Sequence, residues 1–201
     1  MRRVYGDWSS GQLKKWSEKI RALGLVAHQE TANTKGKNAS DIGLVIDAMD
    51  ILHTGRFDGF VLVSSDSDFT RLASRIREEG LNVIGIGERK APEALRNVCN
   101  RFILIENLIE EPATADESNT TKTSRKENPT KAIPLILKAM DKMNIEDEWY
   151  FLGTLGQFIM ADNPDFDTRT YGQKKLSDLI GKLKEFETRK DGTRLMLRRT
   201  N

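Results

Sequence analysis

The sequence predicts two domains, an α/β domain followed by a small helical domain that ends in a β-hairpin. Three observations predict this: apolar runs alternate with helical patterns over the first 110 residues, a polar stretch follows, and an Asp-Gly turn lies near the C-terminus. Strands that alternate with helices through short connections indicate a parallel sheet covered by helices on both faces. We place the domains at residues 1–110 and 131–201, with a linker at 111–130.

The elements of the first domain follow one another in a regular order. Strands are expected at residues 3–5, 25–27, 60–63, 83–86 and 102–105, and helices at 10–23, 40–53, 69–79 and 92–99. The run at 60–63 is apolar at every position, which is typical of a strand buried on both faces of a parallel sheet. The helix over 40–53 has one apolar stripe, and Ser40 is its expected N-cap.

The linker separates this pattern from a different one. Residues 111–130 are rich in threonine, serine, asparagine and charge, so they cannot bury enough surface to order themselves and are expected to be flexible. After them we expect helices at 132–143, 151–160 and 174–183, and then a hairpin that turns at Asp191-Gly192. Three helices and a terminal hairpin form the outline of a winged-helix-like domain. Trp149 is expected in its core.

The composition excludes several classes of protein. The 201 residues include 32 basic and 30 acidic side chains, and a net charge of +2 gives no global attraction to polyanions. The apolar stretches are too short to span a membrane, and the N-terminus lacks the apolar segment of a secretion signal. We therefore expect a cytoplasmic protein without a membrane partner. Cys99 cannot form an internal disulfide and is expected to be buried.

Acidic side chains are expected to meet at one edge of the parallel sheet. Asp66 and Asp68 follow the strand at 60–63, and Asp41 lies in the first turn of the helix at 40–53. Ligands of open α/β sheets bind at the carboxyl ends of the strands. Clustered carboxylates repel one another unless a cation lies among them, and hard oxygen ligands favour Mg²⁺ or Mn²⁺. Such a cation would activate water for attack on a phosphodiester.

The same residues permit other interpretations. Asp66 and Asp68 could merely cap the following helix, because turns rich in serine and aspartate are common between a strand and a helix. The Asp-x-Asp spacing also permits a phosphatase or phosphoryl-transfer enzyme with Asp66 as its nucleophile. Lys35 and Lys37, shortly before Asp41, could hold a phosphate group. Spacing alone leaves these alternatives open.

Several motifs of the first domain are specific enough to compare with known families. They are Tyr5-Gly6-Asp7-Trp8, Gly36-Lys37-Asn38-Ala39-Ser40-Asp41, Gly55-Arg56-Phe57-Asp58 and Ser64-Ser65-Asp66-Ser67-Asp68-Phe69. From residue 1 to about 108 the chain resembles the NYN domain family, and more narrowly its LabA-like (DUF88) branch, a PIN-related group. The resemblance implies a PIN-like sheet and a metal-dependent ribonuclease, with Asp41, Asp66 and Asp68 at positions of the family's acidic site residues.

The chain departs from that family at its start. The family opens with a strand that carries an Asp-rich motif, and with a helix, before the segment that here begins at Arg2. By resemblance this strand is central in the sheet and supplies a first metal-binding aspartate. Three explanations remain open: a start codon assigned too far downstream, a catalytically silent copy, or Asp7 as a substitute acid, although Gly6-Asp7-Trp8 could equally be a structural turn. A chain that starts here should expose a sheet edge and self-associate.

A second group of motifs lies in the C-terminal domain. They are Asn163-Pro164-Asp165-Phe166-Asp167, Arg169-Thr170-Tyr171-Gly172 and the run from Lys174 to Ile180. Over roughly residues 130–200 they resemble the OST-HTH, or LOTUS, domain, a winged-helix-like family associated with RNA or protein partners. Tyr171, Lys174 and Lys175, where the third helix opens, are candidates for RNA contacts. Residues 131–201 carry 13 basic and 11 acidic side chains, so a merely solvated surface is an equal alternative.

The leading hypothesis is a Mg²⁺- or Mn²⁺-dependent ribonuclease joined by a linker to an OST-HTH domain. That domain would tether the nuclease to single-stranded or structured RNA, or to an RNA-associated protein. The alternative is a non-catalytic RNA-binding or regulatory adaptor with an incomplete nuclease domain. A homo-oligomer is a further expected partner.

Overall fold

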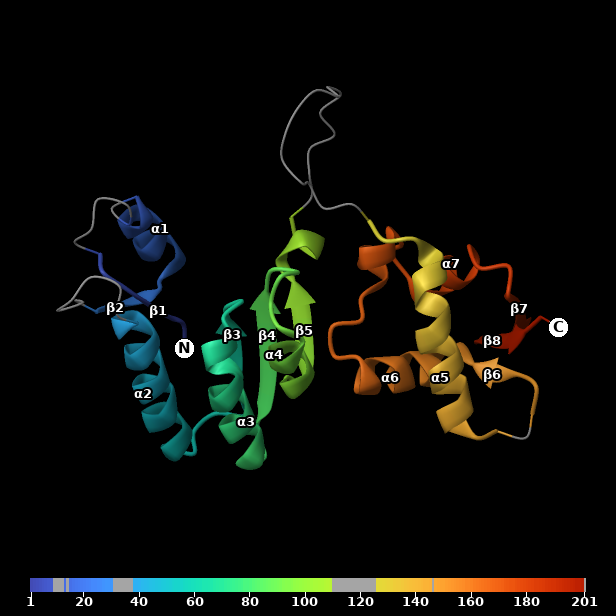
Figure 1. Ribbon diagram of the computed structural model, residues 1–201, viewed down its shortest axis with the longest axis horizontal. Helices are drawn as coiled ribbons and strands as arrows, with labels where there is room; N and C mark the ends of the chain where they lie inside the picture. The colour runs from blue at the N-terminus through green and yellow to red at the C-terminus, as the bar shows by residue number, and fades with distance from the viewer. Residues whose placement is uncertain (9–12, 14, 31–37, 110–125, 146, 201) are drawn as a thin grey trace, which may run out of the picture. The chain divides into compact units, whose positions relative to one another are not determined.

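The computed structural model describes residues 1–8, 13, 15–30, 38–109, 126–145 and 147–200. It divides into two units, Met1–Asp58 and Gly59–Asn201, and each is described by itself. Figure 1 shows the elements along the chain. None of the helices in the described part of the chain is long and apolar enough to cross a lipid bilayer.

The first unit pairs two strands and packs a long helix beside them. Its elements are β1 (Arg3–Gly6), α1 (Trp16–Leu23), β2 (Val26–Gln29) and α2 (Ala39–His53). β1 runs parallel to β2, with Arg3 opposite Val26 and Gly6 opposite Gln29. α1 ends at Leu23, and Gly24 follows with a φ of 60° as the left-handed C-cap that glycine favours. The predicted strands and the helix at 40–53 are present within two residues of their expected bounds, whereas the helix predicted over 10–23 is described only from Trp16, because residues 9–12 and 14 lie outside the described part of the chain.

The core of the first unit is small. Within its described residues, the buried apolar side chains are Ala48 and Leu52, both on α2. Ile42 and Ile46, predicted for the same apolar stripe, are 59% and 57% exposed. No described strand pairs with the second edge of β1. The expectation of a missing middle strand stays a prediction.

The second unit begins with a three-stranded parallel sheet. β3 (Gly59–Val63), β4 (Asn82–Gly87) and β5 (Arg101–Leu104) lie in the order β3-β4-β5. α3 (Thr70–Glu78) and α4 (Glu93–Val98) connect them and pack on the sheet (Figure 1). The buried side chains between these layers include Leu72, Ile76, Val83, Leu95, Cys99, Phe102 and Leu104. The predictions of a parallel α/β sheet and of a buried Cys99 are thus confirmed.

The prediction that β3 is buried on both faces is wrong in this unit. Val61 and Val63 point to the same face of the sheet and are 58% and 67% exposed. On the opposite face Phe60 lies next to Val83, which is fully buried. Strand residues alternate between the two faces, and the described residues of the second unit bury one face more completely than the other. β3 is also an edge strand, because it pairs only with β4 among the described strands.

We expect this exposed strand to make the purified chain self-associate. Val63→Lys should raise the dissociation constant of the dimer roughly tenfold, because burying a valine is worth about 1.5–3 kcal/mol and an edge lysine opposes strand pairing. Sedimentation velocity over a concentration series measures this. Thr188→Lys, at an exposed strand position of the C-terminal domain, is the matched control. An unmodified chain that stays monomeric at all concentrations would contradict the expectation.

The C-terminal domain has the predicted helices and hairpin. Its elements are α5 (Ile133–Met143), β6 (Tyr150–Phe151), α6 (Leu152–Asp162), α7 (Leu176–Ile180), β7 (Phe186–Asp191) and β8 (Arg194–Arg199). β7 and β8 are antiparallel with Asp191 opposite Arg194, and Gly192 supplies the turn with a φ of 57°. β6 joins them in the order β6-β8-β7, which the sequence did not indicate. The fully buried core residues include Ile136, Leu155, Ile159, Leu179, Ile180 and Leu197.

Within the second unit, hydrogen bonds connect the C-terminal domain to the three-stranded sheet. The backbone N–H of Phe102 in β5 donates a hydrogen bond to the Pro164 carbonyl at 2.8 Å. The Asn107 amide donates to Thr170 Oγ1 at 2.9 Å. Residues 126–130, which the sequence places in the linker, contribute as well, since the Glu127 N–H donates to the Thr170 carbonyl at 2.8 Å. Residues 111–125 of the predicted linker lie outside the described part of the chain.

Candidate active site

Asp66 and Asp68 lie where β3 ends and α3 approaches, as the sequence predicts. Asp66 has an extended backbone, and its Oδ1 accepts a hydrogen bond from the Asp68 N–H at 3.0 Å. The Asp66 N–H donates to Ser64 Oγ at 3.1 Å. The capping interaction of the simpler interpretation is therefore present. Both aspartates nevertheless remain exposed at the carboxyl end of the strand, which is where α/β sheets bind ligands.

The neighbouring strand β4 supports this turn from one side. Ser65 Oγ accepts a hydrogen bond from the Glu88 N–H at 2.8 Å. Gly87, the last residue of β4, lies so close that a Cβ there would be 2.5 Å from the Ser64 carbonyl oxygen. The absence of a side chain at Gly87 thus lets the two strand ends approach and fixes the turn that carries Asp66.

If the metal-dependent RNA cleavage predicted from the sequence takes place at this turn, Gly87→Ala should reduce it by up to about 100-fold, the scale expected when a reacting group is displaced by about 1 Å. The added Cβ would push the Ser64-Ser65 turn away from β4. Gly181→Ala is the matched control, because a Cβ there meets nothing closer than 3.5 Å. Initial cleavage rates and thermal melting of both variants provide the comparison. Equal rates for the two variants would show that the position of this turn is unimportant.

Asp41 lies in the first turn of α2 and is half-buried. The predicted N-cap Ser40 is wrong by two residues: α2 begins at Ala39, its N-cap is Asn38, and the Ile42 N–H donates to the Asn38 carbonyl at 3.0 Å. Asp41 belongs to the first unit and the other two aspartates to the second. Their convergence remains a prediction.

The other predicted ligands and phosphate contacts have separate outcomes. Lys35 and Lys37 lie outside the described residues. Within the described part of the chain, no three histidine, cysteine, aspartate or glutamate side chains are grouped as a metal site. The described residues thus place Asp66 and Asp68 together, and a metal site that includes them stays a prediction.

Asp7 forms a defined turn at the end of β1. The Gln29 side-chain amide donates to Asp7 Oδ1 at 2.8 Å and its Oε1 accepts from the Trp8 N–H at 3.1 Å. The Trp8 indole N–H donates to the His28 carbonyl at 2.8 Å. These bonds tie the Gly6-Asp7-Trp8 segment to β2, in agreement with a structural turn. The use of Asp7 as a substitute acid stays a prediction.

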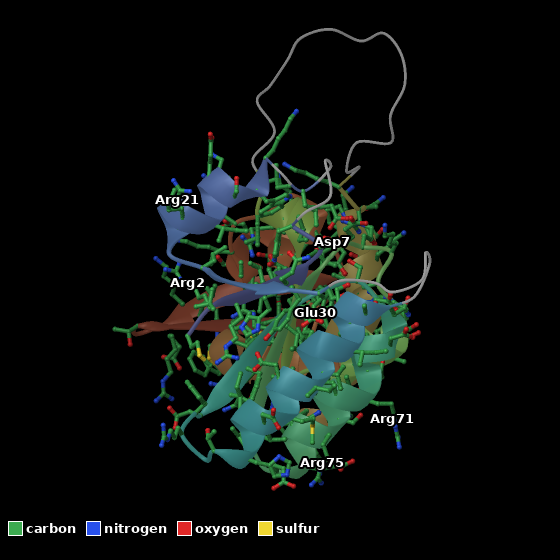
Figure 2. All side chains as sticks on the ribbon, turned by 90° about the vertical axis from the view of Figure 1, so that its left-hand side faces the viewer. Arg2, Asp7, Arg21, Glu30, Arg71 and Arg75 are labelled. Atoms are coloured by element: carbon green, nitrogen blue, oxygen red, sulfur yellow. The ribbon has the colours of Figure 1, made fainter. Side chains whose placement is uncertain are left out.

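Figure 2 shows Asp7 and Glu30 on the first unit and Arg71 and Arg75 on α3 of the second.

Sequence reasoning missed a polar cluster in the first unit. Arg3 and Tyr5 of β1 both donate hydrogen bonds to the Asp47 carboxylate on α2, and Tyr5 stacks on His28 with ring centroids 5.0 Å apart. Burial raises the pKa of the Tyr5 hydroxyl, and its bond to Asp47 adds to this. Burial also acts to raise the pKa of Asp47, but hydrogen bonds from Tyr5 and Arg3 outweigh it and lower that pKa. The signal in the sequence was an aspartate within a largely apolar helix.

The candidate RNA contacts of the C-terminal domain differ in accessibility. Tyr171 packs against the domain core and Phe166, and burial raises the pKa of its hydroxyl. Lys174 and Lys175 are exposed immediately before α7. The prediction of a core position for Trp149 is wrong, because its half-buried ring lies outside the core cluster. The guanidinium groups of Arg189 and Arg198 lie 4.1 and 4.9 Å from the centre of that ring.

Two domain families match the chain, and together they cover most of it. Residues 1–106 match the NYN domain and residues 124–197 match the OST-HTH/LOTUS domain. No functionally curated protein matches the chain.

Two solved structures show limited similarity. A protein of unknown function from Vibrio parahaemolyticus is 22% identical with a TM-score of 0.42, over 51% of this chain and 65% of its own. The chain therefore spans about two thirds of that protein. An uncharacterised protein from Nitrosomonas europaea is 27% identical with a TM-score of 0.32, over 46% of this chain and 92% of its own. Such TM-scores support no inference about activity.

The NYN match covers more than half of the chain and includes the turn that carries Asp66 and Asp68. The three-stranded parallel sheet flanked by helices and the helical C-terminal domain are consistent with the two matched domains. The chain therefore belongs to the NYN domain family and carries an OST-HTH/LOTUS domain after its NYN domain.

Proposed function

We propose that this protein is a metal-dependent ribonuclease that hydrolyses RNA phosphodiesters and uses its OST-HTH domain to hold RNA or an RNA-associated protein. The observation that carries the proposal is the pair of exposed carboxylates, Asp66 and Asp68, at the carboxyl end of β3. The NYN and OST-HTH domains are both RNA-associated, and that association supports the choice of substrate.

The donor chemistry of the pair fits a hard divalent cation, Mg²⁺ or Mn²⁺. Both side chains supply carboxylate oxygens, which such ions prefer. Asp41, in the first turn of α2, is the proposed third ligand, because it matches the position of an acidic site residue of the NYN family. When bound, the cation would polarise the phosphodiester and lower the pKa of a bound water. Lys35 and Lys37 are proposed to hold the phosphate of the RNA strand.

The residues of the chain prepare this reaction by holding the ligands in place. The Asp68 N–H bonded to Asp66 Oδ1 restricts the Asp66 carboxylate, and the Ser64 hydroxyl restricts the backbone before it. In the hydrolysis, the water oxygen forms a bond to phosphorus and the bond to the leaving ribose oxygen breaks. That oxygen then takes up a proton. The proposed tethering domain raises the concentration of RNA near the site without requiring a basic surface overall.

The test uses the purified full chain with labelled single-stranded and hairpin RNAs. Cleavage should require Mg²⁺ or Mn²⁺ and stop when EDTA is added. Titration of Mn²⁺ into the intact chain measures whether the carboxylates bind the ion. Absence of metal-dependent cleavage of both RNAs, in protein that is folded by circular dichroism, would reject the ribonuclease proposal.

A non-catalytic RNA-binding adaptor is the second candidate function. The small core of the first unit favours it, since a rigid scaffold is needed to hold catalytic groups within about 0.5 Å. An adaptor would bind RNA in gel-shift experiments without cleaving it. Cleavage that is lost on Asp66→Asn would exclude the adaptor as the whole function.

A further inference from the structure

A groove lies at the junction between the three-stranded sheet and the C-terminal domain, within the second unit. Its volume is about 340 Å³, near the lower end of ligand pockets. The sheet contributes Arg101, the first residue of β5, and the C-terminal domain contributes Phe166, Asp167, Arg169 and Lys174. The groove is therefore lined by side chains of both the NYN domain and the OST-HTH domain. Neither domain supplies this lining alone.

The two walls of the groove are held together by direct contacts. Next to Arg101, the Phe102 N–H donates to the Pro164 carbonyl at 2.8 Å. One residue further along that loop, Asp165 forms an ion pair with Arg96 of α4 at 2.5 Å. These contacts fix the loop that carries Phe166 and Asp167 beside the start of β5. A ligand would meet both walls at once, without first having to bring them together.

The groove has an excess of positive charge. Asp167 is its acidic lining residue, and Arg169 binds that carboxylate through Nε at 3.0 Å and Nη2 at 2.6 Å. Neither Arg101 nor Lys174 forms an ion pair with a described residue. Three cations and one carboxylate leave a charge of +2 on these side chains. Arg101 also acts electrostatically on the Asp167 carboxylate and helps to lower its pKa, whereas Lys174 lines the groove without an ion pair to a described residue.

Apart from Thr168 and Gly156, the remaining lining is apolar. Met160, Phe166 and Leu176 lie along the groove, and Met160 is 44% exposed. Cations beside apolar side chains match the chemistry of a nucleotide, which presents a phosphate next to a flat apolar base. A protein partner with an acidic tail would satisfy the cations but would make less use of this apolar surface.

We propose that this groove binds the backbone phosphates of an RNA strand, so that the NYN and OST-HTH domains hold one strand jointly. The inference rests on the proposed RNA-related function and adds the path of the strand, which runs over the start of β5. Arg101 then acts as an RNA contact of the NYN domain, outside the proposed catalytic carboxylates. Joint binding by two domains at a fixed separation raises affinity without a strongly basic surface.

The test measures RNA affinity without cleavage. Fluorescence anisotropy of a labelled single-stranded RNA is recorded with the full chain in EDTA over a series of salt concentrations. Arg101→Gln and Lys174→Gln should each weaken binding several-fold. Each should also lower the slope of log K against log salt by about 0.7, the value for one lost phosphate contact on a single strand. Arg101→Lys keeps the charge and should retain most of the affinity.

Lys182→Gln is the matched control, because Lys182 is an exposed lysine of the same domain outside the groove. Equal affinity and salt slope for Arg101→Gln and Lys182→Gln would overturn the proposal. Binding of an acidic peptide in preference to RNA would overturn it as well. The two proposals fail separately: loss of cleavage with an intact Arg101 effect rejects the nuclease, whereas intact cleavage with no Arg101 effect rejects the groove.

Discussion

Asp66→Asn is expected to reduce metal-dependent RNA cleavage by at least about 100-fold. Substituting a residue that only supports a metal ligand costs up to about 100-fold in activity, and a ligand itself should cost at least as much. The substitution removes a negative charge from the proposed ligand set and keeps the shape of the side chain. Asparagine caps helices as well as aspartate does, so the hydrogen bond from the Asp68 N–H to residue 66 can persist. The variant therefore separates the two interpretations of this turn, since capping would survive and metal binding would not.

Asp58→Asn is the matched control for this experiment. Asp58 is exposed directly before β3, at the amino end of the strand that Asp66 follows at its carboxyl end. Its substitution makes the same change of charge far along the strand from the proposed site. Initial rates with Mn²⁺, Mn²⁺ binding and thermal melting should be measured for both variants. Full cleavage by Asp66→Asn would refute the assignment, and equal losses in both variants would point to net charge instead.

Leu155→Ala is expected to lower the free energy of unfolding of the C-terminal domain by about 2–5 kcal/mol. Leu155 is fully buried on α6, in the cluster that also contains Ile136, Leu179 and Leu197. Its loss removes apolar contacts and leaves a cavity that fixed neighbours on α5, α7 and β8 cannot fill completely. Urea unfolding followed by circular dichroism measures the change.

Phe158→Ala is the control for the core substitution. Phe158 lies three residues later on α6 but is 38% exposed, so truncation should cost clearly less although the side chain is larger. If unfolding shows two transitions, the effect of Leu155→Ala should fall on one of them, because the chain has separate compact units. Similar losses for both variants would mean that α6 does not pack as described.

The position of the carboxylate pair could be predicted from local sequence. The apolar run at β3 and the following Ser/Asp residues place Asp66 and Asp68 at the end of a strand, because strand propensity and turn chemistry depend on neighbouring residues. The hairpin turn at Gly192 was predictable for the same reason, since its positive φ requires a residue such as glycine. The close approach that Gly87 permits could not be predicted, because Gly87 lies on a strand more than twenty residues further along the chain.

The surroundings of the aromatic residues show the limit of such reasoning. Trp149 was expected in the core on the basis of its size. Instead, the guanidinium groups of Arg189 and Arg198, both in the hairpin, lie over its ring. Large apolar side chains are usually buried, but cation–π contacts give tryptophan another favourable environment at the surface. Nothing within a few residues of Trp149 indicates those arginines, which lie 40 and 49 positions later.

The sequence by itself determined the two families, the strands and helices and the end of β3 as the candidate site, because spacing and composition act through short-range preferences. The tertiary structure alone decided that β6 joins the hairpin and that one face of β3 is exposed. It also decided that Arg101 lies in a groove with Arg169 and Lys174. These features depend on contacts between distant segments, whose geometry is set by packing of the whole unit and leaves no local pattern in the chain.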